Sequence, residues 1–232
     1  MGIYIVVGAS QGIGSSIAEQ LLAAGHQVHY FSRQASSLTG IQNHPWDAME
    51  SDDSCFSQLT GPIDGFVYCP GSIILKPFHR LSTLDFEQDF KINVLGAVRS
   101  IQATLPLLKQ SPSASIVLFS TVAVQTGMGF HASIASSKGA IEGLTRSLAA
   151  ELSGFHIRVN AIAPSLTQTP LAGSLVNSPE KIEAGGKRHP LGRIGQASDV
   201  ANMAAFLLQV ENSWITGQII GVDGGIGSLR TS

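Results

Sequence analysis

The sequence has few charged residues and no run of either sign. Only 13% of its 232 residues are charged, and 14 Lys or Arg against 16 Asp or Glu give a formal net charge of -2. Proteins that bind nucleic acid or anionic membranes present clustered Lys and Arg. We therefore expect no nucleic-acid partner, no membrane partner and a small-molecule substrate.

Cysteine and long apolar runs are also scarce. Cys55 and Cys69 are too few for a disulfide framework and lack the spacing of metal ligands, so we expect no metal site and a reducing, cytoplasmic location. No stretch of about 18 consecutive apolar residues occurs, and residues 3–7 lack the basic flank of a signal peptide. The expected protein is neither exported nor membrane-spanning.

What the sequence does have is a regular alternation of short apolar runs with segments of helical periodicity. The expected strands are 3–7, 27–31, 65–69, 115–119, 157–163 and 218–222, and the expected helices are 13–24, 82–108, 133–152 and 198–208. Continuously apolar strands are typical of parallel sheets that helices cover on both faces. The sequence predicts a Rossmann-type, doubly wound parallel sheet in a three-layer α/β/α arrangement, as one domain over residues 1–232.

Two further expectations follow from composition. The 44% apolar content beside so little charge indicates a surface partly covered by other protein, which predicts a homo-oligomer. Residues 168–189, rich in Pro, Gly and Ser, form the loosest segment and are predicted to act as a substrate lid.

A glycine-rich turn joins the first expected strand to the first expected helix. Glycine allows a tight turn and a close approach to phosphate, and a helix N-terminus presents unpaired N–H groups. Such a turn can also exist without a ligand, but its position between a strand and a helix favours a dinucleotide pyrophosphate site. The residues predicted to form that site are Gly8, Ser10, Gln11, Gly12, Ile13 and Gly14.

The end of the second expected strand bears on which dinucleotide is bound. NAD sites usually place a carboxylate there, whereas NADP sites place a basic group near the 2′-phosphate. This chain has Ser32 and Arg33 instead of a carboxylate, so Arg33 is a candidate partner of the extra phosphate and Ser32 a second donor. We predict NADP(H) in preference to NAD(H); the alternative is an Arg33 that is merely solvated.

Further along the chain, a series of segments resembles the short-chain dehydrogenase/reductase family over nearly its whole length. The segments are Asp47, Cys69-Pro70-Gly71, Lys91 to Gly96, Arg158 to Pro164, Pro190 to Arg193 and Val222 to Gly225. The second of these departs from the Asn-Ala-Gly of the family and keeps only the glycine, and Ser165 takes a position where the family has Gly.

The resemblance implies roles for individual residues. Asp47 would contact the adenine amino group, Asn93 would hold a water of the proton relay through a distorted helix backbone, and Lys138 would hold the nicotinamide ribose. The remaining positions that the resemblance assigns to the cofactor are Gly71, Pro164, Thr167 and Thr169.

The catalytic signature of the family is incomplete. A Ser, a Tyr thirteen residues later and a Lys four residues after that correspond here to Thr121, Ile134 and Lys138. Thr121 keeps a hydroxyl that could orient a substrate, with Ser120 as the alternative. Ile134 has no proton to donate, so it cannot be a general acid or base.

Another proton source would be needed for turnover, and His131 and Tyr68 are the two candidates, each with an ordinary structural role as the alternative. The substrate is not specified, although Thr126, Met128, Phe130 and Leu171 predict a mostly apolar pocket.

Three functions fit these features. The favoured one is an oxidoreductase of atypical mechanism that acts on a small carbonyl, alcohol or enoyl substrate. The second is an inactive dinucleotide-binding protein with a regulatory role. The third is a structural partner in a mixed oligomer with a homologue, formed through helices 82–108 and 133–152, which resemble the family's dimer-forming pair. The expected assembly is a homodimer or homotetramer.

Overall fold

Seven parallel strands form one sheet in the order β3-β2-β1-β4-β5-β6-β9. The computed structural model describes residues 1–230. The strands are β1 Ile3–Val7, β2 Gln27–Ser32, β3 Ile41–Pro45, β4 Gly65–Tyr68, β5 Ala114–Phe119, β6 Ile157–Pro164 and β9 Ile219–Val222. The six strands listed from the sequence match these to within one residue at each end, and the seventh, β3, lies just before Asp47.

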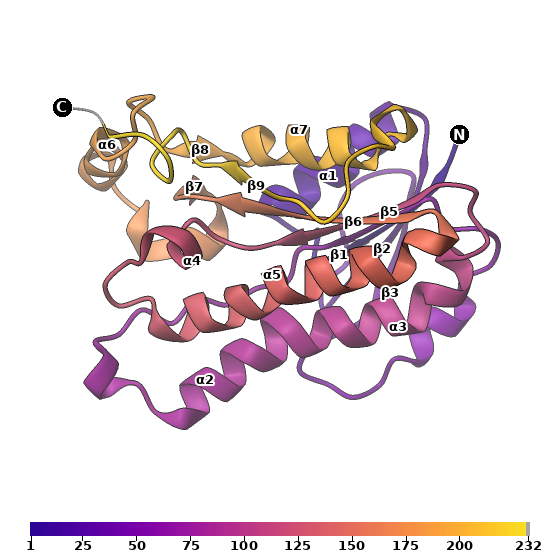
Figure 1. The fold of residues 1–232 in the computed structure, drawn as a ribbon, viewed down its shortest axis with the longest axis horizontal. Helices are drawn as coiled ribbons and strands as arrows, with labels where there is room; N and C mark the ends of the chain where they lie inside the picture. The colour runs from indigo at the N-terminus through magenta and orange to yellow at the C-terminus, as the bar shows by residue number, and fades with distance from the viewer. Residues whose placement is uncertain (231–232) are drawn as a thin grey trace.

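Helices cover both faces of the sheet (Figure 1). One face carries α1 Gly12–Ala23 and α7 Ala197–Leu208, and the other carries α2 Thr83–Phe90, α3 Gly96–Leu108 and α5 Ala132–Leu152. Successive side chains of a strand point to opposite faces, so Ile5 and Val7 of β1 enter the core that α3 and α5 cover, whereas Tyr4 and Val6 enter the core under α1 and α7. The predicted doubly wound, three-layer fold is confirmed.

The predicted helix 82–108 is divided by a π-helical turn at Lys91–Leu95, between α2 and α3. The cause is a side chain: Asn93 Nδ2 donates to the carbonyl oxygen of Asp89 at 2.8 Å. In a regular helix that carbonyl would accept from the backbone N–H of Asn93 itself. The backbone widens by one residue at this point, which is the kind of helix distortion expected around Asn93.

The segment 168–189 has more regular structure than predicted. It contains the end of β7 Thr167–Gln168, a 3₁₀ helix at Pro170–Leu175 and α6 Pro179–Lys187. Thr169 and Ser178 accept hydrogen bonds from backbone N–H groups at the starts of the two helices, and a proline follows each of them. Proline and hydroxyl residues here begin helices, as N1 and N-cap residues do, instead of marking an irregular loop.

The strand order reverses direction between β1 and β4. From β1 the chain continues outward to β2 and β3, and from β4 it continues the other way to β5, β6 and β9. Open α/β sheets bind ligands in the crevice outside the carboxyl ends of the strands at such a switch point. In residues 1–230, no helix is both long enough and apolar enough to cross a membrane.

Gly96, the first residue of α3, is expected to be intolerant of substitution. A Cβ there would collide with the hydroxyl oxygen of Tyr68. That hydroxyl is held by its hydrogen bond to Ile92 O, 2.6 Å away. Gly96→Ala should lower the free energy of unfolding by about 1–3 kcal/mol, the usual cost of overpacking a core. Urea denaturation would measure this.

The matched control is Gly143→Ala in α5, where a Cβ meets nothing within 4 Å. Combining Gly96→Ala with Tyr68→Phe should recover part of the loss. Equal destabilisation by the single and double variants would contradict this account of the Gly96 position.

Candidate dinucleotide and substrate site

Two adjoining cavities lie at the carboxyl ends of the strands. The outer cavity, of about 410 Å³, extends from the glycine turn to Arg33, and the inner cavity, of about 270 Å³, lies between Thr121 and Lys138. They share Ile13, Cys69, Gly71, Thr169 and Leu171. Every residue predicted to bind the cofactor lines one or both, as do Thr121 and His131: Gly8, Ser10, Gln11, Gly12, Ile13, Gly14, Ser32, Arg33, Asp47, Gly71, Asn93, Thr121, His131, Lys138, Pro164, Thr167 and Thr169.

The glycine turn is tightly packed. Gly8 has a φ of +79°, and a Cβ on it would lie 2.7 Å from the ring of Pro70. A Cβ on Gly14 would lie 2.6 Å from the carbonyl oxygen of Gly8. Gln11 at the N-cap of α1 makes no side-chain cap hydrogen bond, and the first turn carries no acidic residue. The first N–H groups of α1 therefore remain available to a phosphate, as a pyrophosphate site requires.

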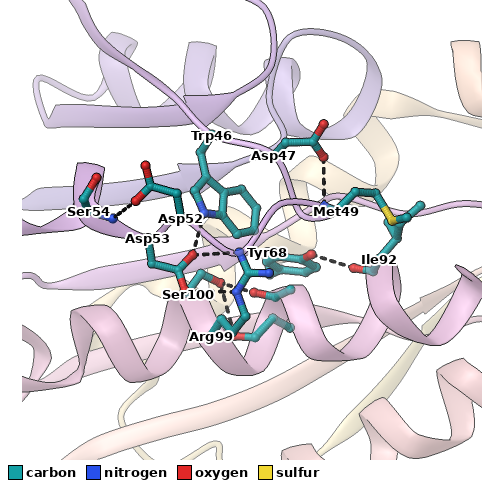
Figure 2. A network of polar contacts seen from close by, with 12 residues as sticks. Trp46, Asp47, Met49, Asp52, Asp53, Ser54, Tyr68, Ile92, Arg99 and Ser100 are labelled. Atoms are coloured by element: carbon teal, nitrogen blue, oxygen red, sulfur yellow. Dashed lines mark hydrogen bonds and ion pairs between the residues drawn. The ribbon is translucent and has the colours of Figure 1, made fainter. Parts of the chain in front are cut away.

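Arg33 lies exposed at the rim of the outer cavity, free to meet a phosphate there. In the structure the Ser32 hydroxyl donates to the carbonyl oxygen of Gln34 at 2.6 Å, and its role as a second donor to the phosphate stays a prediction. Asp47 accepts from the backbone N–H of Met49 at 2.9 Å and lines the same cavity (Figure 2).

Asn93 and Lys138 both reach the inner cavity beside Gly71. A Cβ on Gly71 would lie 3.2 Å from Asn93 Oδ1 and 3.9 Å from Lys138 Nζ. Asn93 is fully buried, and its Oδ1 has no hydrogen-bond partner within residues 1–230. A buried carbonyl oxygen without a partner is costly, so this atom marks a place for a water or ligand donor.

A buried carboxylate lies behind this wall of the inner cavity. Asp89 accepts from Ser72 Oγ at 2.5 Å and from Ser133 Oγ at 2.6 Å, and it has no exposed surface. Burial lowers the pKa of Lys138 to about 8, although nearby Cys69 and Asp89 act in the opposite direction. Burial also raises the pKa of the Cys69 thiol to about 12. Lys138 is therefore a positive group at neutral pH in the inner cavity, which Arg188 also lines.

The hydroxyls near the end of β5 are not equivalent. Ser120 Oγ donates to Glu142 Oε1 at 2.8 Å and is buried. Thr121 Oγ1 accepts from the N–H of Ala123 at 3.3 Å, which leaves its hydrogen for the cavity. This arrangement favours Thr121 over Ser120 as the residue that orients a substrate. Ile134 lines the same cavity and is 4% exposed.

Tyr68 is in the wrong place to be a proton source. Its side chain lines neither cavity, and its hydroxyl donates to Ile92 O in the π turn at 2.6 Å (Figure 2). Burial raises its pKa far above the usual range. The prediction could not resolve this, because β4 is buried on both faces and its apolar run gives no sign of where each side chain points.

His131 lines the inner cavity at the start of α5, with its Nδ1 2.7 Å from the carbonyl oxygen of Gly129. The predicted apolar pocket is correct in part: Met128 and Leu171 line the inner cavity. Phe130, by contrast, is 61% exposed, and the hydroxyl of Thr126 donates to Val122 O in its own helical turn.

One side-chain contact in the inner cavity was not predicted from the sequence. Ser165, noted only as a replacement of glycine, lies 2.9 Å from His189 Nε2. Both side chains line the cavity. The Ser at a glycine position was a signal, but its partner is 24 residues away, and no local pattern links the two.

The residues fit a dinucleotide. The uncapped start of α1 suits the pyrophosphate, Arg33 suits a further phosphate, and Asn93 and Lys138 offer polar groups where the two cavities meet. No group of three or more His, Cys, Asp or Glu suited to a metal ion occurs in the part of the chain that the structure describes.

Comparison with known proteins agrees with this geometry. Residues 8–227 match the sequence model of the family described as enoyl-(acyl carrier protein) reductase. A tropinone reductase homologue of Arabidopsis thaliana is 33% identical, with 96% of this chain and 91% of the relative covered. The L-xylulose reductase of Bos taurus is 31% identical, over 95% of this chain and 94% of its own length.

Among solved structures, a short-chain dehydrogenase family protein from Francisella tularensis superposes with a TM-score of 0.91. It is 27% identical, and the superposition covers 99% of this chain and all of that one.

Replacing Lys138 should separate stability from ligand binding. Below pH 8 the ammonium is charged in both the folded and the unfolded chain, so the cost of burying it applies in full. Between pH 8 and 10.5 the folded protein releases the proton first and the cost disappears. Lys138→Met should therefore raise the free energy of unfolding by about 1–3 kcal/mol at pH 7, with the gain fading as the pH rises.

The same variant should bind NADPH at least about tenfold more weakly, as expected for the loss of charged hydrogen bonds. Denaturation at several pH values and fluorescence titration would measure both effects. Lys91→Met, at an exposed position, is the control and should change neither quantity. Unchanged NADPH affinity in Lys138→Met would exclude Lys138 from the binding site.

Proposed function

This chain belongs to the short-chain dehydrogenase/reductase family of NAD(P)-dependent oxidoreductases, and we propose that it transfers a hydride between NADP(H) and a small carbonyl, alcohol or enoyl substrate. The observation that carries the proposal is the continuity of the two cavities. They connect Arg33, the uncapped start of α1 and Lys138 along the switch point of the sheet.

In this proposal the outer cavity binds and orients the cofactor. Arg33 pairs with the 2′-phosphate, the N–H groups at the start of α1 bind the pyrophosphate, and Asp47 contacts the adenine. Thr169 packs against Gly12, where a Cβ would lie 3.2 Å from the Thr169 side chain, so the turn stays closed over the phosphates.

The inner cavity holds the reacting groups. Lys138 binds the nicotinamide ribose, and Asn93 offers its unpaired Oδ1 nearby. The dinucleotide, when bound, supplies or accepts the hydride. Thr121 orients the substrate oxygen with its free hydroxyl hydrogen, and Ile134 forms an apolar wall that excludes water. Such positioning alone can contribute about 7–11 kcal/mol to a rate.

A second function has one observation in its favour. Ile134 is buried against the cavity, at the position where the resemblance places the proton-donating tyrosine of the family. A chain without a donor would bind the dinucleotide without turnover, in a regulatory role or in a mixed oligomer with an active homologue. The polar groups that Lys138, Asn93 and Thr121 bring to the inner cavity favour the enzyme.

We propose that the chain forms a homodimer or homotetramer in the cytoplasm. Under the second function it would instead form a mixed oligomer with a homologue. Leu84 on α2, together with Phe90 and Leu95 at the π turn, has exposed apolar surface on the single chain. These residues lie in the helix pair predicted for dimer contact. Apolar side chains of this size are usually covered when they cluster.

Arg33 should determine the choice of dinucleotide. The wild-type protein is expected to bind NADPH more tightly than NADH, and Arg33→Ala should weaken NADPH binding by about 10- to 100-fold, the loss of one charge-assisted contact. NADH affinity should stay nearly constant. Arg80→Ala, at an exposed position outside both cavities, is the control in the same fluorescence titrations. Equal wild-type affinity for NADPH and NADH would contradict the NADP(H) assignment.

Restoring the tyrosine should increase carbonyl reduction. In a cavity without another proton donor, Ile134→Tyr should raise the rate by about 10² to 10⁴, the contribution of a positioned general acid; where another side chain already donates the proton, the gain should be smaller. Ile134→Phe, which adds the ring without the hydroxyl, should give no gain. The assay follows NADPH oxidation across a panel of carbonyl and enoyl substrates. NADPH binding without turnover by the wild type on every substrate would replace the proposed enzyme with the non-catalytic binder.

A further inference from the structure

We propose that Ser165 and His189 form a proton-donating pair in the inner cavity: Ser165 Oγ donates to the oxygen of the substrate, and His189 replaces the proton. The inference rests on the proposed function, because it supplies the proton that Ile134 cannot. Ser165 would be the catalytic residue and His189 the residue that positions and recharges it.

The place of Ser165 in the fold supports this role. It directly follows β6, whose last residue, Pro164, accepts a hydrogen bond from the N–H of Val122 at 3.1 Å. That bond joins the loop after β6 to the loop after β5, beside Thr121. The side chains of Thr121 and Ser165 both line the inner cavity. Two hydroxyls thus stand at neighbouring strand ends, where one can orient a substrate oxygen and the other can donate to it.

The hydrogen bonds of His189 define its tautomer. Nδ1 lies 2.8 Å from the carbonyl oxygen of Gly185, and Nε2 lies 2.9 Å from Ser165 Oγ. A carbonyl oxygen only accepts, so Nδ1 must carry the hydrogen, and Nε2 of the neutral ring must accept from Ser165. This is the arrangement of a hydroxyl paired with a base that a third group orients.

The surroundings hold the imidazole in place. His189 is 5% exposed, and Gly224 packs against its ring, where a Cβ would lie 3.3 Å away. A Cβ on Gly185 would lie 2.8 Å from a methyl carbon of Ile194. The glycine therefore allows the end of α6 to approach closely enough for its carbonyl to reach the ring.

Protonation of His189 changes where the O–H bond of Ser165 points. When both ring nitrogens carry hydrogen, Nε2 donates to Ser165 Oγ, and the serine's own hydrogen turns toward the cavity. In reduction, the Oγ–H bond breaks as the proton passes to the substrate oxygen, and Oγ takes the Nε2 proton. The ring is left neutral with its hydrogen on Nδ1. This proton and the hydride of the dinucleotide together convert C=O to CH–OH, and water reprotonates the ring.

The direction of the pH dependence follows. Reduction needs the protonated ring and should slow as the pH rises, whereas oxidation needs the neutral ring and should become faster. The other charged or titratable groups of the cavity wall are Arg188, Lys138 and His131, with Cys69 between the two cavities. Asp223, next to Gly224, accepts the N–H groups of Gly225 and Gly227. On α6, Glu183 pairs with Lys187 in solvent.

The first test uses the protein without any ligand. Nitrogen-15 NMR of the imidazoles, with His189 assigned by the loss of its signals in His189→Gln, should show the Nδ1–H tautomer at high pH. Ser165→Ala should change the chemical shift of His189 Nε2, because the hydrogen bond to it is lost, and Ser153→Ala, an exposed serine at the far end of α5, should not. An Nε2–H tautomer, or an Nε2 chemical shift that Ser165→Ala leaves unchanged, would overturn the pair.

The second test is kinetic. Ser165→Ala should lower kcat for reduction by about 100-fold or more, within the range for a general acid, while NADPH affinity stays constant. Ser165→Thr should keep part of the rate. His189→Gln, which can still hydrogen-bond to Ser165, should remove the pH dependence below about pH 7, where Lys138 stays charged. His79→Gln, exposed and outside both cavities, should behave as wild type.

The outcomes separate the two proposals. If the wild type turns over and Ser165→Ala has the same kcat, the donor role alone is overturned. The same holds if His131→Ala loses the reduction rate and Ser165→Ala keeps it. NADPH binding without wild-type turnover on any substrate would overturn the enzyme and the donor role together.

Discussion

The side-chain amide of Asn93 bonds to the backbone carbonyl of Asp89, and the inner half of the site depends on that hydrogen bond. It holds open the π turn between α2 and α3 and leaves Asn93 Oδ1 facing Gly71 without a partner in the described residues. The same amide donates to Ser72, which bonds to the buried carboxylate of Asp89. Together these bonds fix the wall opposite Lys138 and keep a negative charge near its ammonium.

The inner cavity combines groups that suit binding with one that does not suit proton transfer. Lys138, Asn93 and Thr121 present polar atoms, whereas Ile134 presents only methyl and methylene groups. An apolar wall strengthens electrostatic contacts by excluding water. It also separates two tasks that a tyrosine would combine, because cofactor binding no longer shares a residue with proton donation. The Ser165–His189 pair lines the same cavity from other elements, so it can act independently of Lys138.

The features that were predictable from the sequence are those encoded locally. Apolar runs indicate buried parallel strands, and a glycine turn between a strand and a helix indicates a phosphate site. The structure shows why glycine is required in that turn, since a Cβ on Gly14 would collide with Gly8. The π turn was not predictable in detail, because it results from a side chain competing with the backbone for one carbonyl. The orientation of Tyr68 was not predictable either, since a strand buried on both faces has no polar alternation. The Ser165–His189 contact depends on how α6 packs against the end of β6.

A crystal structure grown with NADPH would test the central claim most directly. The account predicts one dinucleotide per chain, with its 2′-phosphate beside Arg33, its pyrophosphate at the start of α1 and its nicotinamide in the inner cavity beside Lys138. An empty pair of cavities at saturating NADPH, or a dinucleotide bound elsewhere on the chain, would contradict it.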